Sequence, residues 1–340
     1  MLFAKTLVLA LAGAAAAYAL NLPLPWLLGP MLLLTALSMA GMRLRFAAQL
    51  RNPLFALIGF YLGSSVAEQS ALFRVEWLYT AALMLTFTLL ATGVCAWYFM
   101  RAAKYEREHA LLAALPGALA YIVAHLIERD LPATKIIIAQ SVRVLLVVGL
   151  APFLYRHFVG GEPFEVNRFA WQPFESGWLL DLALIAVVAA PVVWLLQRMR
   201  VVNAWFLGGM LASVLCYATG AASHALPAWL LQVLLVFIGA MIGCRFAGAR
   251  IADLLIHGGH SLAAAMLLLA LTALTAWGGA AALNLDPVAM FLAFAPGGVH
   301  EMALIAFAYA IEPVFVTFHH VLRIFFISWL IPITAHHTGK

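Results

Sequence analysis

A Pro-Gly dipeptide interrupts an apolar stretch of this sequence twice, as Pro116-Gly117 and, 180 positions later, as Pro296-Gly297. Proline removes a backbone donor and glycine takes conformations that helices do not use, so each dipeptide is expected to break a helix. A broken helix at membrane depth frees backbone groups that lipid cannot satisfy, so it must be buried in protein or line a cavity. A single break is compatible with an ordinary proline kink, but its recurrence favours a paired feature.

Composition places the chain in a membrane. Of its 340 residues, 66% are hydrophobic and 10% are charged, far more apolar than a soluble domain. The net charge of +5 does not indicate nucleic-acid binding, because the basic residues lie in short clusters between apolar runs, a pattern that sets orientation in a bilayer. Cys95, Cys216 and Cys244 are isolated in apolar segments, so neither a disulfide framework nor a thiolate metal site is expected. The sequence predicts an all-α integral membrane protein.

The chain contains an internal duplication. Residues 25–32 reappear as residues 204–211, and Arg143 reappears as Arg323. We therefore predict a first membrane repeat at residues 1–160 and a second at residues 178–340, joined by a polar linker at 161–177. The first apolar run matches the run at 179–197, so we expect it to be a retained helix rather than a cleaved signal peptide. Each half has six apolar runs, at residues 4–20, 24–41, 53–68, 77–100, 108–127 and 134–155, then 179–197, 202–222, 228–244, 259–283, 288–310 and 314–335.

The distribution of Lys and Arg distinguishes two topologies. If all six runs of each half span, ten basic residues lie inside and seven outside, which is a weak bias. If the fifth run of each half enters and leaves on one side, fourteen lie inside and three outside, which obeys the positive-inside rule. We therefore expect two inverted repeats, each of five transmembrane helices plus a re-entrant or broken helix. This gives about ten spans, with both termini cytoplasmic.

The few ionisable residues inside the apolar runs gather near the breaks. Arg143 and Arg323 lie deep in the last run of each half, and a buried arginine marks either a solute site or a structural ion pair. A helix that begins after a break points free amides at the bilayer centre and favours an anion there. The predicted substrate-binding residues are Pro116, Gly117, Tyr121, Gln140, Arg143, Pro296, Gly297, Gly298, His300, Glu301, His319, His320 and Arg323.

Two structural alternatives stand beside the solute site. Glu301 could neutralise Arg323, or the arginines could satisfy carbonyls freed at the breaks. Against both, Arg143 has Tyr121 where the second half has Glu301, and an unneutralised Arg143 favours a bound anion.

The histidines offer ligand types for zinc, iron or copper, but no His-x-x-x-His pair is present. No metal or catalytic residue is therefore assigned, and His257 and His260 are expected in a turn that enters a helix.

The Trp-Leu/Phe-Leu-Gly-Pro/Gly-Met segment of each half, the paired Pro-Gly breaks and the duplication together resemble the bacterial AbrB membrane protein family over essentially the full chain. Members are labelled ammonia monooxygenases or regulators of aidB expression, and the resemblance implies those labels without explaining them. It implies no settled substrate and no catalytic residues. The first break departs from the second, because Ala118, Ala120 and Tyr121 replace Gly298, His300 and Glu301.

The sequence favours a secondary active transporter of a small anionic organic solute, since inverted repeats, broken helices and charges at the midplane occur together in that class. Alternatives are a membrane-bound regulator of gene expression and an ammonia monooxygenase-like membrane oxidoreductase. The expected partners are the solute and the lipid bilayer, with a homodimer as an option and no nucleic acid. No cofactor is expected beyond a coupling proton or sodium ion.

Overall fold

The computed structural model describes residues 2–68, 74–117, 122, 126, 133–158, 177–224, 226–249 and 251–336. Throughout this part of the chain the regular secondary structure is helical. The helices are α1 (Leu2–Ala19), α2 (Pro25–Met39), α3 (Ala48–Glu68), α4 (Glu76–Arg101), α5 (Arg107–Ala114), α7 (Thr134–Phe158), α8 (Gly177–Arg198), α9 (Ala204–Ala218), α10 (Ala228–Gly243), the 3-10 turn η1 (Cys244–Phe246), α11 (Ile251–Leu283), α12 (Pro287–Phe294), α13 (Val299–Ala308) and α14 (Pro313–His336).

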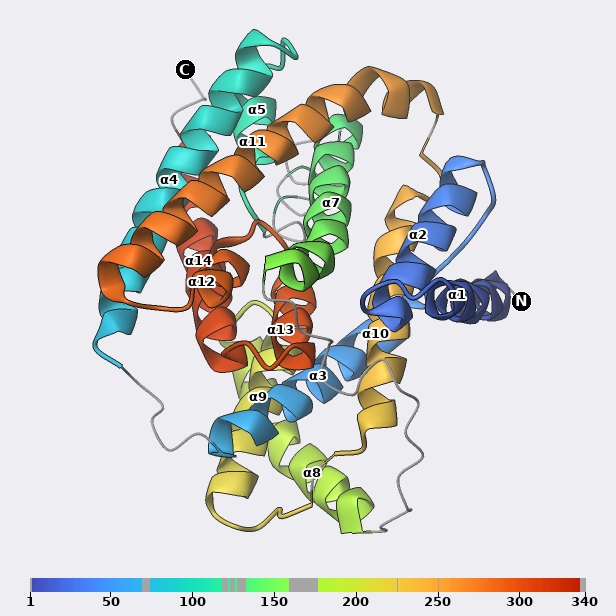
Figure 1. Cartoon of the computed structure of the whole chain (residues 1–340), viewed down its shortest axis with the longest axis vertical. Helices are drawn as coiled ribbons and strands as arrows, with labels where there is room; N and C mark the ends of the chain where they lie inside the picture. The colour runs from blue at the N-terminus through green and yellow to red at the C-terminus, as the bar shows by residue number, and fades with distance from the viewer. Residues whose placement is uncertain are drawn as a thin grey trace.

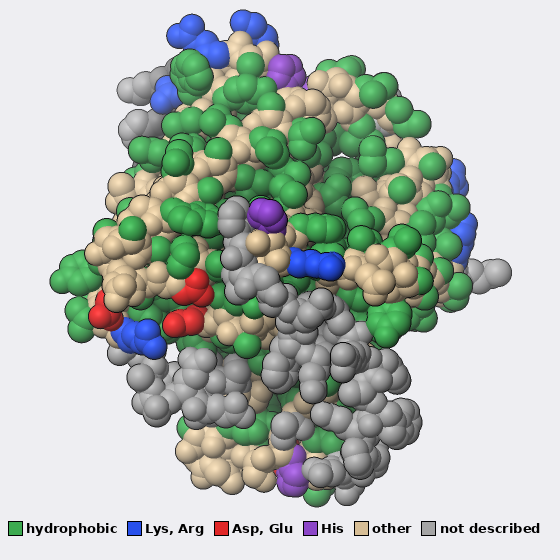
Figure 2. All heavy atoms as spheres, viewed as in Figure 1, with side chains coloured by type: hydrophobic (Ala, Val, Ile, Leu, Met, Phe, Trp, Pro, Cys, Tyr) green, Lys and Arg blue, Asp and Glu red, His purple; other side chains and the backbone are tan. Residues whose placement is uncertain are grey.

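The protein is a helical membrane protein, as predicted. Six of its described helices are long and apolar enough to cross a bilayer, namely α1, α4, α7, α8, α10 extended through η1, and α11. Shorter apolar helices lie between and after them in the chain. Figure 2 shows a largely apolar face on which the charged side chains form a few small groups. An apolar exterior of this kind suits lipid rather than water.

The helices form a core flanked by two three-helix groups (Figure 1). One group contains α1, α2 and α10, and the other contains α8, α9 and α3. The two groups correspond under the duplication, because α1, α2 and α3 match α8, α9 and α10. Each half therefore gives its third helix to the group formed by the first two helices of the other half.

Glycines explain this exchange. A Cβ on Gly239 of α10 would overlap the carbonyl oxygen of Leu27 in α2, and a Cβ on Gly59 of α3 would overlap the carbonyl oxygen of Phe206 in α9. Small residues allow helix backbones to approach this closely, and the van der Waals packing that results is one of the forces that hold helices together in lipid. The repeated glycines thus specify contacts between the halves rather than within each half.

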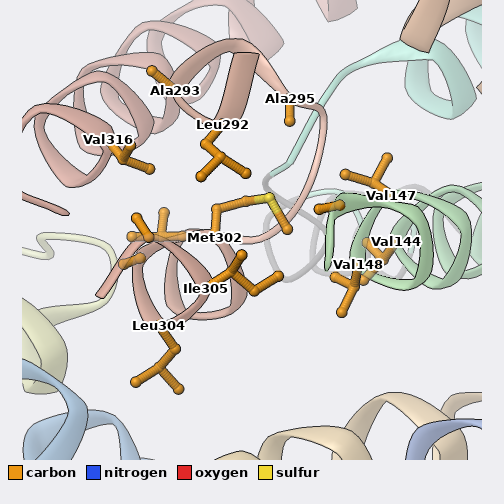
Figure 3. Packing of buried hydrophobic residues seen from close by; sticks show 14 of the residues in the cluster. Val144, Val147, Val148, Leu292, Ala293, Ala295, Met302, Leu304, Ile305 and Val316 are labelled. Carbon is orange, nitrogen blue, oxygen red and sulfur yellow. The ribbon is translucent and has the colours of Figure 1, made fainter. Parts of the chain in front are cut away.

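The core consists of α4, α5, α7 and α11 to α14, and it brings the second break against the first half. Met302 of α13 lies between Leu292 of α12 and the valines of α7 (Figure 3). Its side chain is fully buried, and a Cβ on Gly297 would lie 2.8 Å from its Cγ. The tip of the second break is therefore packed against the last helix of the other half.

Candidate functional site

The second break forms because its sequence starts and stops helices in quick succession. Asp286 caps α12 by accepting a hydrogen bond of 2.8 Å from the Val288 amide. The helix ends at Phe294, and Ala295 is extended (φ −54°, ψ 137°) because the residue before a proline avoids the α conformation. Gly298 is the N-cap of α13. The predicted interruption at Pro296-Gly297 is confirmed.

The first break has the same form up to its tip. The helix α5 ends at Ala114, and Leu115, which precedes Pro116, is extended (φ −55°, ψ 122°). Gly117 has a φ of +89°, a conformation that L side chains rarely adopt. The predicted site residue Tyr121 lies outside the described residues.

At the second break, Arg323 of α14 binds the end of α12. Its Nη1 donates to the carbonyl oxygens of Phe294 (3.2 Å) and Ala295 (2.8 Å), and its Nη2 donates to Gly297 O (3.2 Å). Nη2 also donates to Nδ1 of His320 (2.7 Å), whose Nε2 donates to Leu292 O (2.9 Å). These partners fix a neutral imidazole that carries its proton on Nε2.

Arg143 of α7 binds the end of α5 in the equivalent way. Its Nη1 donates to Ala113 O and Ala114 O (both 3.4 Å), and its Nη2 donates to Leu115 O (2.9 Å) and to Oε1 of Gln140. Gln140 Nε2 donates to the carbonyl oxygens of Leu115 (3.0 Å) and Leu112 (3.0 Å). Leu112 occupies the position in the first half that corresponds to Leu292 in the second. The two halves thus hold their breaks in the same manner but through partly different carbonyls. Arg323 reaches Gly297 O at the tip of its break, whereas Arg143 reaches Ala113 O within α5.

A guanidinium suits these positions for an electrostatic reason. The last carbonyls of a helix have no partner within the helix and carry the negative end of its dipole, so a cation there is stabilising. The side chains of Arg143 and Arg323 are buried, with 4% and 1% of their surfaces exposed. The alternative in which the arginines satisfy the freed carbonyls therefore describes the contacts seen. Whether they also bind a solute stays a prediction.

Glu301 pairs with Arg245 rather than with Arg323. Its Oε1 lies 3.2 Å from Nη2 of Arg245, which follows α10 in η1. The alternative in which Glu301 neutralises Arg323 is therefore wrong, because α10 brings another arginine to the first turn of α13. A Cβ on Gly298 would overlap the Glu301 carboxylate, so only a glycine at position 298 leaves room for this carboxylate. The second carboxylate oxygen is buried and has no hydrogen-bond partner.

The three imidazoles near the second break point to three different surroundings. His300 stacks on Phe55 of α3, with ring centroids 3.5 Å apart. His319 donates from Nδ1 to Phe315 O (2.8 Å) and accepts from Thr80 of α4 at Nε2 (2.9 Å). His320 serves Arg323, as described above. The predicted site residues of the second break therefore share one region without converging on one point.

Arg143 lies within electrostatic reach of two other buried or half-buried arginines, Arg323 and Arg245. Arg143 and Arg323 lie close enough for their charges to repel, and so do Arg143 and Arg245. Glu301 is the carboxylate that pairs with one of them in the described part of the chain. This arginine cluster, defined by Arg143, Arg245 and Arg323, is therefore positively charged among the described residues.

A second polar group joins the ends of α4 and α11 near the first break. Burial raises the pKa of Tyr105, in the loop after α4, to about 12, so its hydroxyl remains protonated at neutral pH. This hydroxyl shares a hydrogen bond of 3.1 Å with Nδ1 of His257, and Tyr98 meets His260 Nδ1 at 3.3 Å. The predicted turn at these histidines is wrong, because α11 already begins at Ile251 and Gly258 and Gly259 lie within it.

Sequence reasoning missed Arg245 as a site residue. It directly follows the predicted run at 228–244, where a basic residue usually marks the membrane surface. One signal was present, since position 65 in the first half, which corresponds to Arg245, holds a serine. A charged residue that differs between the two halves and directly follows the glycines of α10 indicates a candidate site residue.

Fold and site together define a multi-pass helical membrane protein with a polar centre at two interrupted helices. The chain belongs to the AbrB family, because residues 26–338 match the family described as "Transition state regulatory protein AbrB". It is 30% identical over 294 residues to "Putative regulator AbrB" of Escherichia coli (strain K12), covering 85% of this chain and 82% of the relative. It is 25% identical over 295 residues to "Uncharacterized protein YhjN" of Bacillus subtilis (strain 168), covering 81% and 75%. No solved structure matches the chain.

Proposed function

We propose that this protein is a secondary active transporter of a small anionic organic solute, with its site at the two Pro-Gly breaks near the bilayer midplane. The observation that carries the proposal is the arginine cluster. Burying a charge in a membrane is costly unless it is paired or faces a polar ligand. Three arginines with one paired carboxylate among the described residues leave positive charge that a solute carboxylate can neutralise.

The duplication supports transport of the alternating-access kind. In this proposal the halves are inverted, each has five spans and one re-entrant hairpin, and both termini face the cytoplasm of a bacterial inner membrane. Sites between such repeats can open alternately to the two sides when one group of helices rocks against another. The α1–α2–α10 and α8–α9–α3 groups, which exchange a helix between the halves, are the units that we expect to move against the core.

The coupling ion in this proposal is a proton carried by Glu301. Arg245 is available to the solute only when the carboxylate that pairs with it is neutralised. Sodium is the competitor, with carbonyl oxygens at Gly297 and Gly298 as its ligands. Gly297 O already accepts a hydrogen bond from Arg323, which favours the proton.

Uptake by proteoliposomes tests the proposal. The purified chain is reconstituted into liposomes preloaded with unlabelled carboxylates, and entry of the labelled compounds is followed by counterflow. We expect saturable exchange of at least one small carboxylate, absent from protein-free liposomes and retained in Arg156→Gln, whose parent residue is an exposed arginine of α7. If no small carboxylate in the panel exchanges above the protein-free level, the proposal fails.

A membrane-bound regulator is the second candidate, because the 30% identical relative carries the name of a regulator. Transcript profiles of a deletion strain separate the candidates when it is complemented with the parent or with Arg143→Gln. A regulator that does not transport restores the profile in both cases, whereas a transporter whose solute causes the changes restores it only with the parent. The oxidoreductase label rests on family resemblance alone.

A further inference from the structure

A small cavity adjoins Arg143 between α4, α5, α7 and α11. Its volume is about 10 Å³, which is room for roughly one water molecule. Most of its wall consists of short side chains, among them Ala114, Ala139 and Ala264. Because helical interiors are close-packed, a void beside a buried arginine calls for an explanation.

The corresponding region of the second half is filled. Phe294 stands in the position that matches Ala114, His319 matches Ala139, and Met84 of α4 matches Ala264. All three side chains are fully buried, and the rings of Phe294 and His319 lie 6.0 Å apart. The space beside Arg143 therefore results from three small residues in one half and not from the architecture that both halves share.

Arg143 supplies the charged group of the cavity. Its two Nη atoms are bound to carbonyls and to Gln140, whereas its Nε is buried without a hydrogen-bond partner. Other polar groups of the wall already have partners, because Ser261 Oγ donates to His257 O (2.6 Å) and the Cys95 thiol contacts Ala264 O (3.8 Å). No carboxylate of the described residues forms an ion pair with Arg143. The cavity thus offers one cation and an otherwise largely apolar wall.

We propose that this cavity receives the carboxylate of a short-chain monocarboxylate, such as acetate or propionate. One negative charge matches the single guanidinium, and the methyl groups of the alanines accommodate a short apolar chain. The second charge of a dicarboxylate would face apolar side chains such as Ala264 and Leu268, which cannot stabilise it. Because the cavity holds roughly one water molecule in this structure, the ligand can enter only in a conformation in which α4, α5, α7 and α11 lie further apart. This inference rests on the proposed function and names its substrate class.

Binding tests the inference without requiring transport. Acetate, propionate and succinate are presented to the full chain in detergent, and saturation-transfer NMR measures their binding. We expect saturable binding of acetate and propionate, mutual competition between them, and at least about tenfold weaker binding of succinate. Ala264→Met, which installs the residue of the matching position, should weaken acetate binding at least about tenfold. Ala263→Met, the same change on an exposed position of α11, should leave binding unchanged.

The inference would be overturned if the parent chain showed no saturable acetate binding, or if Ala264→Met bound acetate as tightly as the parent. Binding of chloride or succinate as tight as that of acetate would also overturn it, since the cavity would then not select monocarboxylates. The thermal unfolding midpoint confirms that Ala264→Met is folded, and Ala139→His provides an independent way to fill the same space. If Ala264→Met exchanged carboxylates as the parent does, the proposed transport function would stand and the cavity would not be the binding site. If the parent bound acetate but exchanged no carboxylate, the cavity would stand as a binding site and the proposed transport function would fail.

Discussion

Gln140 and His320 occupy matching places at the two breaks and make matching bonds. Gln140 Nε2 donates to Leu112 O at 3.0 Å, and His320 Nε2 donates to Leu292 O at 2.9 Å. Each then presents an acceptor to the arginine three residues later. An amide and a neutral imidazole both offer one donor side and one acceptor side, which explains how two residue types serve one role.

Exchanging these two residues should therefore be tolerated. We expect the free energies of unfolding of His320→Gln and Gln140→His to lie within about 1 kcal/mol of the parent value, since donor and acceptor are both kept. His320→Leu removes both and leaves a buried carbonyl unsatisfied, which should cost about 1–3 kcal/mol. Chemical denaturation in detergent measures these differences. Equal stability of His320→Leu and His320→Gln would show that the bonds to Leu292 and Arg323 contribute nothing.

Even conservative replacements of Arg143 and Arg323 should abolish function. Arg143→Gln and Arg323→Gln are expected to abolish solute exchange while the protein is still inserted in the membrane. Arg323→Lys should fail as well, because an ammonium cannot reproduce the planar fork that binds three carbonyls. Counterflow in proteoliposomes is the measurement, with Arg156→Gln as the matched control. Exchange at the parent rate by either glutamine variant would remove that arginine from the site.

The glycine contacts predict a contrast between two identical substitutions. Gly239→Ala places a methyl group on the Leu27 carbonyl and should destabilise the protein by about 1–3 kcal/mol. Gly93→Ala adds the same methyl group to α4, where it would meet no described atom within 4 Å beyond the backbone of its own helix, and should be neutral or stabilising by up to about 1 kcal/mol. Thermal unfolding of the two variants decides the matter. A Gly239→Ala protein as stable as Gly93→Ala would contradict the close packing of α10 on α2.

Much of the helical framework could be predicted from sequence, because apolar runs, Pro-Gly breaks and a 180-residue repeat report local propensity and burial. The pairing of helices across the halves could not, since the Gly239 contact with Leu27 depends on which helix lies opposite. For the same reason the sequence could not show that Thr80 of α4 binds His319, one of the predicted substrate-binding residues. Arg245 was missed because its partner Glu301 lies 56 residues away in the chain.

Topology can be tested by labelling. The positive-inside count predicts that Met1, Arg129 and Lys340 all face the cytoplasm. Single cysteines are placed at these positions in a background without Cys95, Cys216 and Cys244, and intact cells are treated with an impermeant maleimide. We expect labelling only after the cells are broken. Labelling of the Arg129 position in intact cells would exclude the re-entrant arrangement of the first half.

The carboxylate of Glu301 should couple transport to the proton gradient. Protonation removes the charge that pairs with Arg245, and a glutamine at position 301 imitates that protonated state permanently. Glu301→Gln should therefore lose accumulation driven by a proton gradient while downhill exchange remains measurable.

Vesicles that carry only a proton gradient or only a sodium gradient separate the two coupling ions. We expect accumulation with the proton gradient alone, its loss in Glu301→Gln, and its retention in Glu312→Gln. The last variant is a matched control, because Glu312 is a more exposed carboxylate that lies 3.7 Å from Arg74. Accumulation driven by sodium alone, unaffected in Glu301→Gln, would assign coupling to freed carbonyls at the break rather than to the Glu301–Arg245 pair.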